Sequence, residues 1–311
     1  MTDTTAPGDD AGHVIALSQT ASHEEGALSR TLRYFRRNPT LPVGLALLGA
    51  LLIFTFGGRL VWPVSMADPL SGFPSMPPGG DHPLGTDTQG RDILAVTIAG
   101  TWLTMRTGLL AAALGTAIGG GLGFIAGYFG GWIDNIINWT VDVLLTVPAI
   151  LILVVIAASV SGQLSSFSMA FIIALLAWRR PTRQVRSQVL VMRNMGYVDT
   201  ARLSGMGDLE IIWRELIPNL LPYLVAVFVL AVSAAILAAV GLQAMGLGPQ
   251  NEPTLGMTIY WMMYYSAFLQ GMWWWIAPPV VVLIVLFVGF YLVSAGLDEF
   301  ANPRLRMKGG A

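Results

Sequence analysis

Very few side chains in this sequence could carry out covalent or acid–base chemistry. The chain has no cysteine, so disulfides, thiolate nucleophiles and cysteine-bound metals are excluded. Its histidines are His13, His23 and His82, which leave little for a catalytic or metal site. We therefore predict no catalytic residue and no metal site.

Asp142 is the one carboxylate inside a clearly apolar segment. A charge within a membrane is costly, so this carboxylate should face protein or water and have a partner. We favour a structural pair with a nearby arginine over a proton relay, because Asp142 is a lone acid near the end of its segment. Pro148 lacks an amide hydrogen and is expected to kink the same helix.

The elements that must position these residues are membrane helices. The chain has 17 Lys and Arg and 18 Asp and Glu, and hydrophobic residues make up 54% of it. This composition excludes a disordered chain. The formal net charge of −1 provides no electrostatic footprint for phosphates, so we expect a lipid membrane as partner and no nucleic acid.

Six apolar segments are candidates for membrane spans, since about 20 apolar helical residues cross a hydrocarbon core. The fourth is the shortest, because Arg179 interrupts it, and it must extend toward residues 162–167 or lie inside protein. We predict an all-α membrane protein with six transmembrane helices, near residues 41–62, 107–129, 139–160, 168–178 and onward, 218–242 and 274–296.

The positions of the basic residues predict the orientation. Four of the 17 Lys and Arg precede the first span, seven lie between spans four and five, and three follow the last. The positive-inside rule then makes both termini cytoplasmic in a multi-pass protein of the plasma (inner) membrane. We expect a disordered cytoplasmic tail (1–29), a first helix with a basic lead-in (30–66), an external loop (67–101), a five-helix core (102–296) containing a cytoplasmic loop (179–217), and a cytoplasmic C-terminal tail (297–311).

Four glycines recur at four-residue spacing in the second span. On a helix they form one smooth stripe that lets another helix approach closely. We favour a packing face over a ligand site for these residues, which are Gly115, Gly119, Gly123 and Gly127.

The loop after the fourth span concentrates charge in a chain that otherwise avoids it. Arg179, Arg183 and Arg186 fall on one face of a helix that continues the fourth span. A short helix over residues 198–204 should stop at Gly205, since glycine adopts a left-handed cap without penalty.

Beyond Gly205, Asp208 is a candidate N-cap of an amphipathic segment. Pro218 and Pro222 are then expected to begin a new helix. A basic loop can merely obey the positive-inside rule, but the ordered caps favour a rigid elbow on which another protein docks.

This elbow resembles the cytoplasmic signature of the membrane subunits of ABC importers, which reads Glu-Ala-Ala, Gly and Ile-x-Leu-Pro. The matching residues at the family spacing are Asp199-Thr200-Ala201, Gly205 and Leu216-Ile217-Pro218-Asn219. Asp replaces Glu, and Thr replaces the first Ala.

Further motifs resemble the dipeptide/oligopeptide/nickel branch, of the second-permease (C) type. They begin with His82-Pro83-Leu84-Gly85-Thr86-Asp87 and continue through Gly90-Arg91-Asp92. The others are Ala126-Gly127-Tyr128-Phe129-Gly130-Gly131-Trp132, Asp142-Val143-Leu144-Leu145 with Pro148, Gly246-Leu247-Gly248, and Asn302-Pro303-Arg304-Leu305-Arg306.

The resemblance implies the type I ABC importer transmembrane-domain fold, paired with a homologous second permease. Two ATP-binding cassette ATPase domains would dock inside and an extracytoplasmic substrate-binding protein outside. ATP and Mg would be bound by the ATPases, so this chain would bind no cofactor and would not be an enzyme. The residues that would couple to the ATPases are Asp199, Thr200, Ala201, Arg202, Gly205, Met206 and Asp208.

The transported solute is less well defined by the sequence. Some family members carry an acid and a Trp-Gly pair where this chain has Ala239 and Leu255-Gly256. An aromatic run follows, which we interpret as an interfacial belt rather than a surface for sugar rings. Peptides are the favoured solutes, with oligosaccharides, glycosides or nickel chelates as alternatives. Two alternatives come from other functional classes, namely a proton-coupled carrier and a structural membrane anchor. The run comprises Trp261, Tyr264, Tyr265, Trp273, Trp274 and Trp275.

Overall fold

The computed structural model describes residues 39–160 and 162–301, so the predicted tail 1–29, most of the C-terminal tail, His13 and His23 lie outside it. Apart from two isolated β-bridges, the secondary structure of the described residues is helical. The elements are α3 (Thr40–Val61), η1 (Val64–Ala67), α4 (Ile93–Phe129), α5 (Gly131–Thr146), α6 (Ala149–Ser159), α7 (Ser166–Ala177), α8 (Arg179–Met192), α9 (Gly196–Leu203), α10 (Asp208–Ile211), the π-helix η2 (Ile212–Leu216), α11 (Ile217–Ala244), α12 (Leu255–Tyr264) and α13 (Trp273–Ala301).

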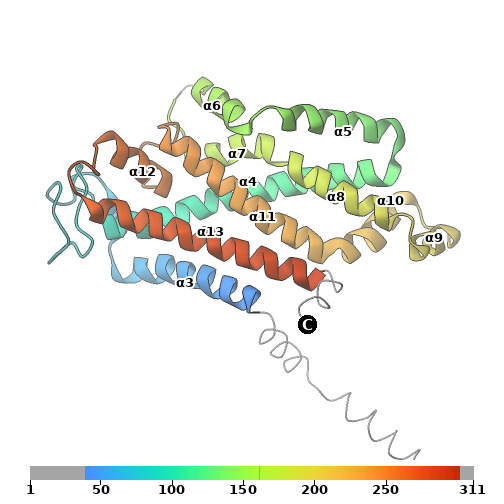
Figure 1. Cartoon of the computed structure of the whole chain (residues 1–311), viewed down its shortest axis with the longest axis horizontal. Helices are drawn as coiled ribbons and strands as arrows, with labels where there is room; N and C mark the ends of the chain where they lie inside the picture. The colour runs from blue at the N-terminus through green and yellow to red at the C-terminus, as the bar shows by residue number, and fades with distance from the viewer. Residues whose placement is uncertain (1–38, 161, 302–311) are drawn as a thin grey trace, which may run out of the picture.

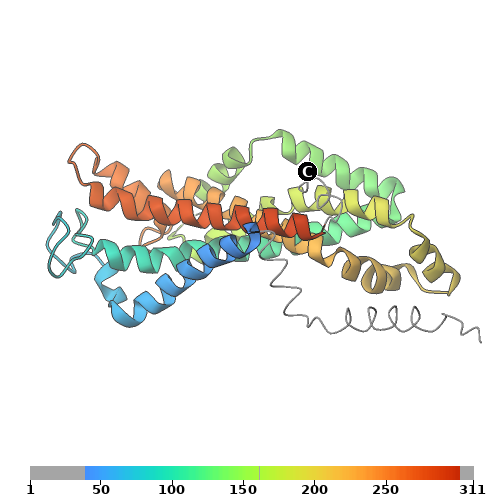
Figure 2. The ribbon, with the colours of Figure 1, turned by 60° about the horizontal axis from the view of Figure 1, so that its bottom comes forward.

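The long helices run roughly along one axis, with α4 in the middle of the bundle (Figure 1). Helix α4 packs against α3, α7, α8 and α11, and α13 packs against α3 and α11. Figures 1 and 2 place α5 and α6 on the side away from α3. The loops before α4 lie at the same end as α12, and α9 and α10 lie at the opposite end.

The described residues contain four helices that are long and apolar enough to cross a membrane. The third predicted span is a broken one, because α5 and α6 meet at an angle of 84° beside Pro148. The fourth is α7, a short helix that is mostly buried inside the protein and continues as α8. The six-helix prediction is compatible with this arrangement.

Of two predicted helix starts, one differs from the structure and the other agrees with it. Helix α4 begins at Ile93, inside the predicted external loop 67–101, because the Asp92 carboxylate caps it by accepting from the Ala95 amide at 2.8 Å. The new helix expected at Pro218 is confirmed, since α11 begins at Ile217 with Pro218 in its first turn, whereas Pro222 lies inside α11. The wider π-turn of η2 ends at Leu216, two residues before Pro218, which cannot donate a backbone hydrogen bond.

The glycine stripe of α4 lies against α7 and α8. A Cβ on Gly115 would lie 2.5 Å from the Ala177 Cβ, and one on Gly119 would lie 2.3 Å from the Trp178 carbonyl oxygen. At Gly123 and Gly127 the nearest atoms belong to α8. The absence of side chains on this face therefore sets how closely α8 approaches α4.

Candidate functional site

Helix α9 ends in the turn that the sequence predicts at Gly205. Gly205 has a φ of +82° and donates its amide to the Arg202 carbonyl, and the Met206 amide donates to the Ala201 carbonyl at 3.2 Å. These two bonds form a Schellman motif, which satisfies the last carbonyls of the helix. The predicted stop at Gly205 is confirmed.

One face of α9 is buried against the rest of the protein. Val198 and Ala201 belong to a core cluster with Phe124 and Tyr128 of α4. Tyr197 packs against the same cluster, and burial raises the pKa of its phenol. The side chain of Ala201 thus faces inward, and the outward face of α9 carries Asp199, Thr200, Arg202 and Leu203.

The sequence suggested Asp208 as a helix N-cap, but the structure shows that it does not cap a helix. Gly207 is the N-cap of α10, and the Asp208 carboxylate instead accepts from the Tyr128 hydroxyl at 2.7 Å. The Arg202 guanidinium lies 5.6 Å from the centroid of the same ring, and it pairs with Asp199 at 3.2 Å. Tyr128 therefore connects the end of α4 to both sides of the turn at Gly205, which sequence patterns did not predict.

The arginine face of α8 packs against α5 rather than facing solvent. Arg186 forms a two-point pair with Asp134, at 2.5 Å from Nε to Oδ1 and 2.7 Å from Nη2 to Oδ2. One α-helical turn earlier, Arg183 lies 3.1 Å from Asp142, and both of these side chains are about half exposed. Asp142 thus has the arginine partner that a structural role requires.

Two more arginines of this region bind backbone carbonyls. Arg179 is buried and donates through Nη1 to the Leu144 carbonyl on α5. Arg193 donates to the Gly127 carbonyl at 2.9 Å, next to the end of α4. The arginines of the basic loop therefore make fixed contacts that join α8 to α4 and α5.

We predict that the Arg186–Asp134 pair contributes about 1.5–3 kcal/mol to the free energy of unfolding, as hydrogen bonds between charged groups do. The test is a double-mutant cycle of Arg186→Gln and Asp134→Asn, measured by chemical unfolding in detergent. Arg180→Gln serves as control, because Arg180 is exposed on the same helix. Strictly additive effects of the two substitutions would contradict the prediction.

Large apolar side chains are exposed around this elbow. Leu203 at the end of α9 is 90% exposed, and Leu209 and Trp213 are 66% and 69% exposed. Leu209 and Trp213 also line a cavity of about 670 Å³ between α4, η2 and α11, together with Phe124 and Phe228. Exposed apolar groups of this size mark a surface that contacts another protein or the membrane.

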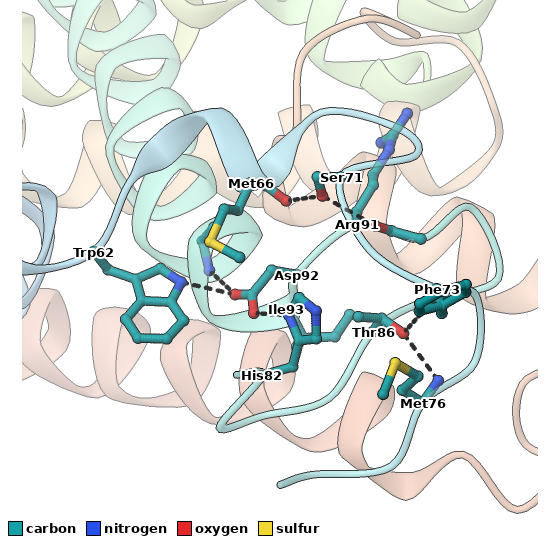
Figure 3. A network of polar contacts seen from close by, with 12 residues as sticks. Trp62, Met66, Ser71, Phe73, Met76, His82, Thr86, Arg91, Asp92 and Ile93 are labelled. Atoms are coloured by element: carbon teal, nitrogen blue, oxygen red, sulfur yellow. Dashed lines mark hydrogen bonds and ion pairs between the residues drawn. The ribbon is translucent and has the colours of Figure 1, made fainter. Parts of the chain in front are cut away.

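The opposite end of the bundle is organised around the buried carboxylate of Asp92 (Figure 3). Asp92 is fully buried and receives the Trp62 indole N–H at 3.1 Å and His82 Nδ1 at 2.8 Å. Nearby, Asp87 accepts the Arg91 amide at 2.9 Å, and burial raises the pKa of this carboxyl. These motif residues therefore fold the segment between α3 and α4 onto the start of α4.

The aromatic run near α12 packs mainly against itself. Trp275 is fully buried, and Tyr265 stacks on Trp261 with ring centroids 5.9 Å apart. Only part of the run stays open, since Tyr264 and Trp273 are both 64% exposed. The buried members form a core at this end of the bundle. Packing into this core accounts for them without an interfacial belt or a sugar-binding surface.

Residues 119–307, more than half of the chain, match the protein family described as the binding-protein-dependent transport system inner membrane component. The chain belongs to this family. It is therefore a multi-pass membrane protein and a permease subunit of an ABC importer, with the type I fold that the elbow motif implied. The Gly205 turn and most of the glycine stripe lie within the matched region.

Named relatives extend the similarity over most of the chain. A peptide transport system permease of Brucella abortus is 31% identical over 287 residues, which cover 90% of this chain and 93% of the relative. The oligopeptide permease OppC of Mycobacterium bovis is 31% identical over 76% of this chain and 82% of its own length. The dipeptide permease DppC of Bacillus subtilis is 29% identical over 88% of this chain and 85% of its own length.

A solved structure, the inward-facing MetNI methionine ABC transporter, is also similar. Its TM-score is 0.48 at 21% identity, and the match covers 65% of this chain and 96% of the other.

Proposed function

We propose that this permease imports short peptides and is driven by ATPase subunits that dock on α9. The observation that carries the proposal is the elbow, in which a capped helix presents Leu203 outward while Val198 is anchored against α4. A displacement of α9 by a docked partner would be transmitted to α4 through this core and through the Tyr128–Asp208 hydrogen bond. The residue types thus suit a rigid lever better than a flexible loop.

The remaining assignments follow from the family. A homologous second permease, two ATPase domains and an extracytoplasmic binding protein would complete the importer in the plasma membrane. Both termini would be cytoplasmic, and ATP and Mg would be bound by the partners, with no cofactor on this chain. Asp199, Thr200, Arg202, Gly205, Met206 and Asp208 would form the contact and its supporting turn.

Peptides are the proposed solutes because several relatives are named as peptide, oligopeptide or dipeptide permeases. The oligosaccharide alternative loses support, because Trp261, Tyr265 and Trp275 are occupied in packing. A proton-coupled carrier is disfavoured by the pairing of Asp142 with Arg183.

We expect Leu203→Cys, labelled with a maleimide photo-crosslinker, to capture an ATP-binding subunit of the co-expressed importer. The chain has no other cysteine, so the label marks one position. Leu60→Cys is the matched control, because Leu60 is 89% exposed at the opposite end of the bundle. Mass spectrometry identifies the captured protein. Capture of an ATPase from position 60, or none from position 203, would refute the proposal.

A further inference from the structure

Arg106 is a charged residue of α4 whose guanidinium is only loosely paired. It lies over the Phe167 ring, 4.5 Å from the centroid, and its Nη2 is 4.0 Å from the Glu252 Oε2. Charge-assisted N–H···O bonds measure about 2.7–2.9 Å. Arg106 and Glu252 therefore attract each other without sharing a hydrogen bond.

Glu252 is held by a different helix. Its Oε1 accepts the Ser166 amide at 3.1 Å, and its Oε2 accepts the Ser166 hydroxyl, so the carboxylate binds the first residue of α7. Arg106 Nε, by contrast, is buried and has no hydrogen-bond partner among the described residues. An unmet buried donor is costly, so its presence requires an explanation.

The face of α4 that carries Arg106 stays open along much of the helix. Ala113, Ala117 and Gly121 follow it at helical spacing, are all exposed, and line the cavity near the elbow. The glycine stripe that packs against α8 lies on a different face. Exposed small residues thus occupy this face toward the α9 end of the bundle, beyond Leu110, which is partly buried between Arg106 and Ala113.

We propose that Arg106 binds the free carboxylate of the transported solute on this face of α4. A guanidinium offers a planar fork of donors that matches a carboxylate bidentately. Arg106 is recessed, with 28% of its side chain exposed, and exposed small residues lie further along the same face of α4. Both features suit a small mobile solute better than a side chain of a docked protein. The inference rests on the peptide import proposed above.

The test compares trialanine with its C-terminal amide in proteoliposomes that contain the complete importer and its binding protein. We expect Arg106→Gln to lower kcat/KM for trialanine about tenfold, the loss of one charged hydrogen bond, and to leave uptake of the amide within about twofold. Arg106→Lys, which keeps the charge without the fork, should fall between. Arg59→Gln is the control, because Arg59 is exposed on α3.

A second measurement does not depend on uptake of the amide. Phe167→Cys would place the only thiol of the chain beside an intact Arg106, and trialanine should slow its modification by a methanethiosulfonate at least about threefold, as expected for a site two-thirds filled or more by ligand. An N-acetylated alanine amide should not protect it. Equal losses of uptake for both peptides, or no protection by trialanine, would overturn the role of Arg106. A wild-type importer that moves no peptide would instead overturn the proposed function itself.

Discussion

Replacing Gly119 by alanine is expected to lower the free energy of unfolding by about 1–3 kcal/mol, as overpacking does. The added Cβ would lie 2.3 Å from the Trp178 carbonyl oxygen and 3.0 Å from the Pro181 Cβ. Both belong to the start of α8 or the residue before it, and backbone atoms cannot rotate away as a long side chain can. The contact between α4 and α8 must therefore open.

Gly121→Ala is the matched control on the same helix. A Cβ there would meet nothing within 4 Å, and alanine is a better helix former than glycine by about 1 kcal/mol. Gly121→Ala should therefore be neutral or stabilising. Thermal unfolding of the purified variants in detergent measures both effects. Equal unfolding temperatures for the two variants would show that the stripe does not determine this contact.

Gly205→Val is expected to reduce ATP-driven uptake at least about tenfold while the permease still inserts and assembles. A Cβ at this position would meet nothing within 4 Å in this chain, so any effect on the permease's own fold must come from the backbone. Valine at a φ of +82° costs on the order of 1–3 kcal/mol, enough to replace the Schellman turn with another conformation. Helix α9 would then lose its fixed angle to α10.

The informative control is Gly205→Asn, because asparagine tolerates the left-handed region far better than valine. It should retain most of the uptake. The measurements are peptide uptake and ATP hydrolysis by the reconstituted importer, with hydrolysis expected to persist in the valine variant. Normal uptake with valine would show that the turn is not part of the coupling path.

Some features were predictable because they depend only on neighbours in sequence. The apolar run of α3, the kink at Pro148 and the stop at Gly205 follow from residue type and local spacing alone. The family resemblance was carried by the same local motifs, since the signature around Gly205 lies in one short turn. These predictions required no knowledge of which helices meet.

The amino-acid sequence by itself determined that the chain is a helical membrane protein with a capped elbow, because hydrophobicity and backbone preference act locally. Only the tertiary structure decided that Arg186 pairs with Asp134, that Tyr128 binds Asp208, and that Arg106 keeps an unmet donor. The physical reason is distance along the chain. Tyr128 and Asp208 are 80 residues apart, and only the packing of whole helices brings their polar atoms to hydrogen-bond range.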